Sequence, residues 1–204
     1  FNALHRLKRP RAFDEAVADR HDAMRAAICR RVEVADNSGL CGMKKMKIIS
    51  FEDAARLVAD NAVVSISSSS GLNTPDRMLA ALGARFASEG HPRNLTTLHP
   101  IGTGDMYGIK GVDHLARPGM LRRIIAGSFP SGPSHFASPL IWQMINDDQL
   151  AAYNVPSGIM FDMHRDVAAR RAGVLTRIGL HTFVDPDLQA CARNPSAARE
   201  TIVS

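Results

Sequence analysis

Residues 63–75 read VVSISSSSGLNTP, which is an apolar run followed by a loop of serines and a glycine and then a Thr-Pro pair. The run AVVSI (62–66) contains β-branched residues and predicts a short strand that is buried on both faces. Thr74 and Pro75 predict the start of a helix, with Thr as the N-cap and Pro in the first turn. The expected buried side of that helix consists of Met78, Leu79, Leu82 and Phe86. A strand, a small-residue loop and a helix in succession indicate an α/β unit.

Strands and helices continue to alternate on both sides of this unit. The motif SFED (50–53) predicts a capping box that begins a short helix. Further strands are expected at 94–99, 121–127 and 149–155, and a strand or strand-turn at 173–180. Helices are expected at 138–147 and from Pro156 to residue 170, and a loop with a short helix at 108–116. This order favours a mostly parallel, doubly wound α/β sheet with helices on both faces, over residues 47–190.

Charge divides the chain into unequal parts. Residues 1–47 hold 11 Lys/Arg against 6 Asp/Glu, whereas the other 157 residues hold 14 of each sign. Residues 1–46 are therefore expected to be a basic N-terminal extension, helical or poorly ordered, and residues 191–204 a truncated C-terminal tail. A neutral body argues against a nucleic-acid partner, because such proteins carry a basic face.

Membrane and secretory locations are also disfavoured. No apolar stretch approaches the roughly 18 residues that cross a bilayer, and the start FNALHRLKRPRAF has no apolar core typical of a leader. The cysteines Cys29, Cys41 and Cys191 form no CxxC pair, so neither a disulfide framework nor a zinc site is indicated. We expect a cytoplasmic protein without a membrane partner.

Three loops rich in small residues each follow a predicted strand: SSSSGLN (67–73), HPIGTGD (99–105) and VPSG (155–158). Ligands of parallel sheets collect at the carboxyl ends of the strands, and small residues let backbone N–H groups approach an anion. A purely structural role for such loops remains open, as does a loop-positioning role for Asp105. His164 is interpreted as a helix-face residue. GxGxxG, GxxxxGK[ST] and GxSxG motifs are absent, which argues against nucleotide-phosphate loops and serine hydrolases.

Several stretches resemble the N-terminal, or alpha, half of the family I coenzyme A transferases, acyl-CoA:acetate/3-ketoacid or propionate type. The resemblance covers about Lys47 to Gln189. It lies in VVSISSSSGLNTPDRMLAALGARF, NLTTLHPIGTGDMYGIKGVDHLA, AAYNVPSGIMFDMHRDVAARRAGVLTRIGL and HTFVDP.

The resemblance implies a ping-pong transfer of CoA from an acyl-CoA to a short-chain carboxylic acid, as in short-chain fatty acid and ketone body metabolism. It implies that a glutamate of the C-terminal, or beta, half is the nucleophile, so that no catalytic residue is expected here and a beta-type half or subunit is required. Coenzyme A is implied as a substrate, and no other cofactor and no metal is expected. The protein is expected to form a homo- or hetero-oligomer. The substrate-binding residues implied are Ser68, Ser69, Ser70, Gly71, Asn73, Gly102, Gly104, Asp105, Pro156, Ser157 and Gly158.

The sequence departs from the family pattern at two positions. Ser157 stands where the family commonly has glutamine, and His181 stands where it has glycine before TFVDP. These departures leave a second hypothesis open, a non-catalytic remnant or regulatory subunit of the same fold. A sugar-phosphate isomerase of related fold is a third, disfavoured because the loops offer no acid/base pair.

Overall fold

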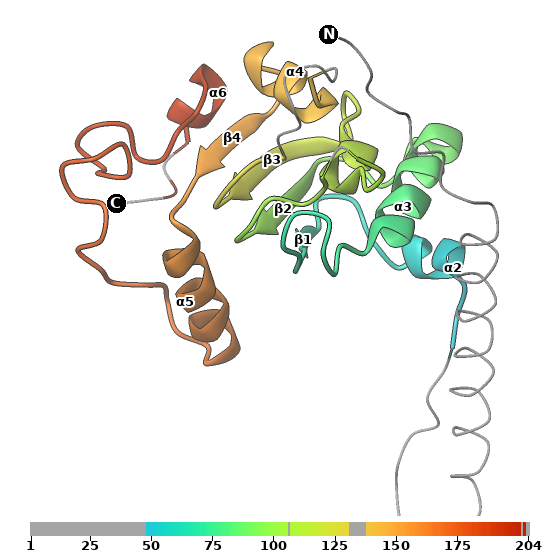
Figure 1. The fold of residues 1–204 in the computed structure, drawn as a ribbon, viewed down its shortest axis with the longest axis horizontal. Coiled ribbons are helices and arrows are strands. Elements are labelled where there is room, and N and C mark those ends of the chain that lie inside the picture. The colour runs from blue at the N-terminus through green and yellow to red at the C-terminus, as the bar shows by residue number, and fades with distance from the viewer. Residues whose placement is uncertain (1–47, 106, 131–137, 201, 203–204) are drawn as a thin grey trace, which may run out of the picture. The chain divides into compact units, whose positions relative to one another are not determined.

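Four parallel strands form the sheet of this protein in a computed structural model that describes residues 48–105, 107–130, 138–200 and 202. They are β1 (Val63–Ser65), β2 (Leu95–His99), β3 (Leu121–Ala126) and β4 (Ala151–Asn154). Their spatial order is their chain order, β1-β2-β3-β4, and every pair is parallel (Figure 1). The predicted α/β fold with a parallel sheet is confirmed. The predicted extension, residues 1–46, lies outside the described residues.

Three helices cover one face of the sheet: α3 (Asp76–Glu89), the 3-10 helix η2 (Gly111–Leu115) and α4 (Leu140–Asn146). Each lies in the crossover between two consecutive strands. Right-handed crossovers that all step in the same direction place their helices on the same face. The main hydrophobic core lies between these helices and the sheet. Among its members are Leu79, Leu82, Leu95, Val112, Leu115, Ile124, Ile141, Met144 and Ala152.

The opposite face carries α5 (Ser157–Ala168) and the chain that follows it to α6 (Pro195–Ala198). A second cluster there includes Ile125, Tyr153 and Met160 with Cys191 and Ala197. Helices therefore lie over both faces, as predicted, although the strand order never reverses within the described sheet. Cys191, Ala192 and Ala197, which follow residue 190, pack in this second cluster.

The first strand differs from its prediction. β1 is the edge strand of the order given above, and its residues alternate exposed, half-buried and exposed. Val63 is 64% exposed. The prediction of a strand buried on both faces is wrong here, because an apolar run of this length does not report how many neighbours a strand has.

Two helix starts tested the capping predictions. Ser50 is the N-cap of α2 (Phe51–Arg56), and its Oγ accepts a hydrogen bond from the Asp53 N–H at 3.0 Å, as predicted. α3 begins one residue later than expected. Its N-cap residue is Pro75, and no side chain caps the helix. The Thr74 hydroxyl instead donates to the Ser70 carbonyl at 2.6 Å. The predicted cap at Thr74 is wrong because its hydroxyl is used within the preceding loop.

Residues 173–180 form no strand, contrary to the prediction of a strand or strand-turn. The segment runs as irregular chain and turns from the end of α5. Its apolar side chains stay exposed: Leu175, Ile178 and Leu180 are 102%, 61% and 47% exposed. No neighbouring strand within the described residues receives them, so apolar alternation here does not produce sheet pairing.

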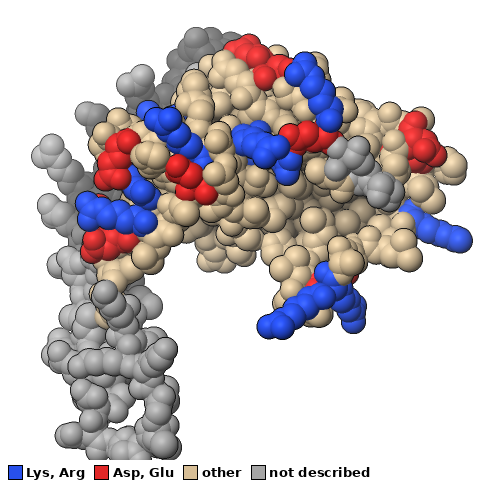
Figure 2. All heavy atoms as spheres, turned by 180° about the vertical axis from the view of Figure 1, so that it is seen from behind, with Lys and Arg blue, Asp and Glu red and all other residues tan. Residues whose placement is uncertain are grey.

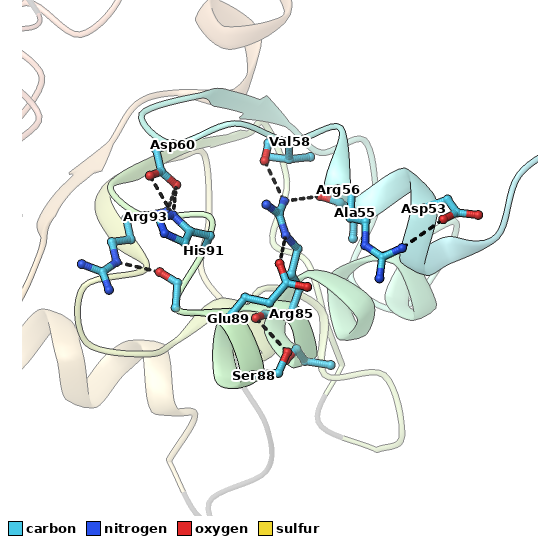
Figure 3. A network of polar contacts seen from close by, with 12 residues as sticks. Asp53, Ala55, Arg56, Val58, Asp60, Arg85, Ser88, Glu89, His91 and Arg93 are labelled. Carbon is cyan, nitrogen blue, oxygen red and sulfur yellow. Dashed lines mark hydrogen bonds and ion pairs between the residues drawn. The ribbon is translucent and has the colours of Figure 1, made fainter.

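A polar network joins α2 to α3 (Figure 3). The guanidinium of Arg85 in α3 donates from Nη1 to the carbonyl oxygens of Ala55 and Val58 at 2.8 and 2.9 Å. Its Nε donates to Glu89 at 2.9 Å. These carbonyls lie at the end of α2, where helix carbonyls lack helical partners. Arg85 thus closes the end of α2 and ties it to α3.

Charges of both signs are interspersed on the face shown in Figure 2, with no large area of a single sign there. No described helix is long and apolar enough to cross a membrane.

Candidate functional site

The loops after β1 and β2 are joined by their backbones. The Ser70 N–H donates to the Gly102 carbonyl at 2.8 Å, and the Gly104 N–H donates back to the Ser70 carbonyl at 3.0 Å. Ser70 and Thr103 thereby form an isolated parallel bridge beyond the ends of the two strands. This isolated bridge fixes the serine loop against the GTGD loop.

Asp105 holds the second loop in shape. Its Oδ1 accepts hydrogen bonds from the N–H groups of Tyr107, Gly108 and Ile109 at 2.9, 3.2 and 3.0 Å. Burial raises the pKa of Asp105, but these backbone hydrogen bonds outweigh it and hold the pKa below its usual value. Of the two roles left open by the sequence, the loop-positioning one is present in the structure.

Gly71 lies against Asp105. A Cβ added at Gly71 would overlap the Asp105 carboxylate. Only a residue without a side chain lets the serine loop approach this carboxylate so closely.

The third loop reaches the second through Ser157. The Ser157 hydroxyl donates to the Pro100 carbonyl at 2.6 Å, so its hydrogen is used within the protein. Pro156 is the N-cap residue of α5, and Gly158 lies in its first turn with no atom within 4 Å of an added Cβ. The space beside Gly158 is open, whereas the serine side chain is fixed.

A fourth loop, after β3, belongs to the same edge and was missed by sequence reasoning. The Gly127 N–H donates to the His99 carbonyl at 3.0 Å, and Ser128 Oγ accepts from the Gly102 N–H at 2.7 Å. The Asn154 amide donates to the carbonyls of Ala126 and Gly127 at 3.1 and 2.9 Å. The signal was present as IAGSFP (125–130), which has the same pattern of a strand followed by small residues.

All three predicted loops therefore lie together at the carboxyl edge of the sheet, which we call the rim. The rim consists of residues 67–73, 99–105, 127–128 and 155–158. The remaining predicted residues of the serine loop take fixed places in it. Ser69 closes a tight turn with Leu72, Ser70 and Asn73 have φ of 55° and 56°, and Ser68 Oγ is buried with no partner among the described residues.

His99 lies at the end of β2, beneath the rim. It is fully buried, and neither of its ring nitrogens has a hydrogen-bond partner in the described part of the chain. Burial lowers the pKa of His99 to about 4, so the ring is neutral at pH 7. Phe129 packs edge-on against it with ring centroids 6.3 Å apart.

The TFVDP stretch forms a compact turn around Asp185. The Asp185 carboxylate accepts from the N–H groups of His181 and Asp187 at 2.7 and 3.0 Å, and these bonds lower its pKa. His181 has φ of 62°, a left-handed conformation that favours glycine. This left-handed conformation explains why the family pattern has glycine at this position. In this chain, His181 adopts it.

A hollow of about 730 Å³ lies elsewhere, between the loop 186–190 and α6. None of its lining residues, which lie between 186 and 200, belongs to the rim. Its lining mixes apolar and charged side chains, among them Leu188, Arg193 and Glu200, and we assign it no chemistry. The described residues contain no cluster of three or more His, Cys, Asp or Glu that would hold a metal ion.

Known proteins similar to this chain are CoA-transferases. A caffeate CoA-transferase from Acetobacterium woodii is 27% identical over 157 residues, covering 76% of this chain and 28% of the relative. The acetate CoA-transferase YdiF from Escherichia coli (strain K12) is 26% identical over 159 residues, covering 78% of this chain and 29% of the relative. No family model matches the chain.

Solved structures agree with the sequence comparison. The acyl-CoA transferase YdiF from Escherichia coli O157:H7, in a thioester complex with CoA, superposes with a TM-score of 0.65 at 26% identity, over 76% of this chain and 29% of that one. Its apoenzyme gives the same TM-score over 77% of this chain. The chain thus spans less than a third of the length of the curated relatives it matches. In sequence and in fold, it is a relative of the family I coenzyme A transferases.

Proposed function

We propose that this chain is the N-terminal half of a CoA-transferase that moves CoA between an acyl-CoA and a short-chain carboxylic acid. The rim supplies the pocket for the acyl and carboxylate groups, and a beta half supplies the glutamate nucleophile. The single observation that carries the proposal is the convergence of the small-residue loops at one edge of a parallel sheet, on a chain related to acyl-CoA transferases. Coenzyme A enters as a substrate, and no further cofactor takes part.

The glutamates of the described residues support a nucleophile from another half. Glu52 lies in the first turn of α2, and Glu89 pairs with Arg85 at 2.9 Å. Glu200 is paired with Arg122 and Arg123. None of these three carboxylates belongs to the rim. A carboxylate held by two arginines is also a weaker nucleophile, because its charge is already neutralised.

Exposed apolar side chains support a partner surface. Leu175, Ile178, Leu180, Phe183 and Leu188 lie between 42% and 102% exposed along residues 175–188. Soluble monomers rarely leave so many large apolar side chains exposed in one segment, and such segments mark interaction sites. We assign this surface to contact with the beta half, and we expect a cytoplasmic homo- or hetero-oligomer.

The test is co-expression with a candidate beta-type half that carries the family glutamate. The complex, incubated with acetyl-CoA, should form a glutamyl-CoA adduct on the beta half that mass spectrometry detects, and should transfer CoA to a short carboxylic acid. The chain by itself should transfer none. Turnover by the isolated chain would contradict the need for a beta half.

A matched pair of variants tests the rim within that complex. Gly158→Val places a side chain in the open space beside α5 and should raise the KM for the carboxylic acid. Leu140→Val, on α4 and away from the rim, should leave it unchanged. Equal effects of the two variants would argue against a rim pocket.

A second function is favoured by Ser157. Its hydroxyl hydrogen is used on Pro100, so it is not available to hold a substrate carbonyl where the family commonly has glutamine. A non-catalytic remnant or regulatory subunit would bind its partner without any adduct forming. Restoring activity by Ser157→Gln in a complex that is otherwise inactive would support this second reading.

A further inference from the structure

A serine and a histidine that are 99 residues apart in sequence meet on the face of the sheet that carries α5. Ser65 Oγ, in β1, lies 2.7 Å from His164 Nε2, in α5. The other ring nitrogen, Nδ1, lies 2.7 Å from the Met160 carbonyl oxygen. A carbonyl oxygen only accepts hydrogen bonds, so Nδ1 carries the hydrogen of the neutral ring. Nε2 is then the acceptor, and the Ser65 hydroxyl donates to it.

This polarity is the one a base needs to activate a serine. The base must accept the hydroxyl proton, and a third group must hold its ring in the right tautomer. Met160 provides the third group from the preceding turn of the same helix. Neither interaction is part of the rim hydrogen bonds described above.

Ser65 is accessible and its surroundings are apolar. Ser65 is exposed at the edge of the sheet, and His164 is half-buried. Val63, two residues earlier on the same side of β1, is 64% exposed, and Phe161, one turn before His164, is 45% exposed. Leu98 is the residue opposite Ser65 in β2. These side chains favour an apolar acyl group over a charged one.

The free edge of β1 supplies hydrogen-bond donors. The carbonyl of Ala62 and the N–H of Ile66 pair with β2, so by alternation the N–H groups of Ser65 and Ser67 point to the other side. Within the described residues, neither amide has an acceptor. Backbone N–H groups beside a nucleophile stabilise the oxyanion that forms on attack.

We propose that Ser65 is a nucleophile activated by His164, which accepts acyl groups from uncharged, apolar esters or thioesters. Ser65 Oγ bonds to the carbonyl carbon of the donor while its proton passes to His164 Nε2. The bond from that carbon to the leaving alcohol or thiol breaks, and the leaving group takes up the proton. Water then attacks the acyl-serine and gives a proton to His164 Nε2. The bond from the acyl carbon to Ser65 Oγ breaks, Oγ takes up that proton from His164, and the carboxylic acid is released. The proposal is independent of CoA transfer, whose nucleophile is a glutamate.

The direct test treats the full chain with a fluorophosphonate probe and locates the adduct by peptide mass spectrometry. We expect one adduct, on Ser65, that Ser65→Ala removes and that Ser88→Ala, at an exposed position on α3, retains. His164→Gln should slow labelling at least tenfold, since general-base catalysis contributes roughly 100-fold or more. The rate of p-nitrophenyl butyrate hydrolysis should change in the same way: Ser65→Ala should abolish it, and His164→Gln should lower it. An adduct elsewhere, or a labelling rate that His164→Gln leaves unchanged, would overturn the proposal.

A thiol pair keeps the test valid if His164→Gln does not fold. Ser65→Cys and Ser67→Cys each place one new thiol on the same exposed segment, two residues apart, with His164 intact. The Ser65→Cys thiol should react with iodoacetamide at pH 7 at least tenfold faster, because His164 accepts its proton. Equal rates for the two thiols would refute activation by His164.

Discussion

Asp105 shows how a single carboxylate fixes a loop that the sequence describes only as rich in small residues. It accepts from three consecutive backbone N–H groups and also limits what residue 71 can be. A side chain that satisfies three donors is worth more to the fold than one surface ion pair, because each donor left without a partner costs free energy.

Asp105→Ala should lower the free energy of unfolding by about 1–3 kcal/mol, since it leaves three N–H groups without an acceptor. Asp105→Asn should lose less, because its side-chain oxygen still accepts. Urea denaturation followed by circular dichroism measures both. Asp147→Ala, an exposed carboxylate after α4, serves as the control and should change stability little. A loss at position 105 no larger than this control would contradict the loop-holding role.

Gly127 and Gly158 differ in how much space the rim leaves for a side chain. A Cβ at Gly127 would overlap the Pro100 carbonyl oxygen and Ser157 Oγ, whereas one at Gly158 meets nothing within 4 Å. Gly127→Ala should therefore cost about 1–3 kcal/mol through overpacking. Gly158→Ala, in the first turn of a helix, should be neutral or stabilising by up to about 1 kcal/mol. Thermal unfolding of both variants decides, and the reverse order would show that the rim is packed differently.

At the scale of elements, α2 depends on α3. It is a helix of six residues, too short to be stable without tertiary contacts. Its end is held by the charged hydrogen bonds from Arg85 (Figure 3). The chain at α2 is therefore ordered by a residue 27 to 30 positions later.

Arg85→Met keeps the aliphatic stem but removes the donors to Ala55 and Val58. It should reduce stability by about 1.5–3 kcal/mol, the range for hydrogen bonds to charged groups. Hydrogen exchange should show α2 amides exchanging faster while those of β2 and β3 lose less protection. Arg117→Met, at an exposed position after η2, is the matched control. Unchanged exchange in α2 would refute this role of Arg85.

At the scale of the whole molecule, a buried neutral histidine makes stability depend on pH. His99 has a pKa of about 4 in the folded protein against an ordinary value of 6.5. The unfolded chain therefore binds a proton at a higher pH than the folded one. The stabilisation is fully present above pH 6.5 and is lost as the pH falls toward 4.

This loss should amount to about 3 kcal/mol between pH 6.5 and pH 4. Urea unfolding at a series of pH values measures it. His99→Leu removes the titrating ring and should flatten the profile over this interval. A profile of the same slope in His99→Leu would show that another group is responsible.

The sequence predicted most elements because their signals are local. The N-cap at Ser50, the buried residues Leu79 and Leu82 of α3, and strands β2 to β4 all follow from periodicity and end signals within a few residues. The three small-residue loops were also placed correctly, because parallel strands bring their carboxyl ends to the same edge of the sheet. Their role in binding stays a prediction.

Only the tertiary structure decided which groups meet across the sheet. The edge position of β1, the contact of Gly127 with Pro100, the burial of His99 and the pairing of Ser65 with His164 each depend on residues far apart in sequence. The order of strands and the direction of their crossovers set these neighbours, and no short stretch of sequence encodes them. Local sequence thus determined what each segment is, and packing determined what each segment touches.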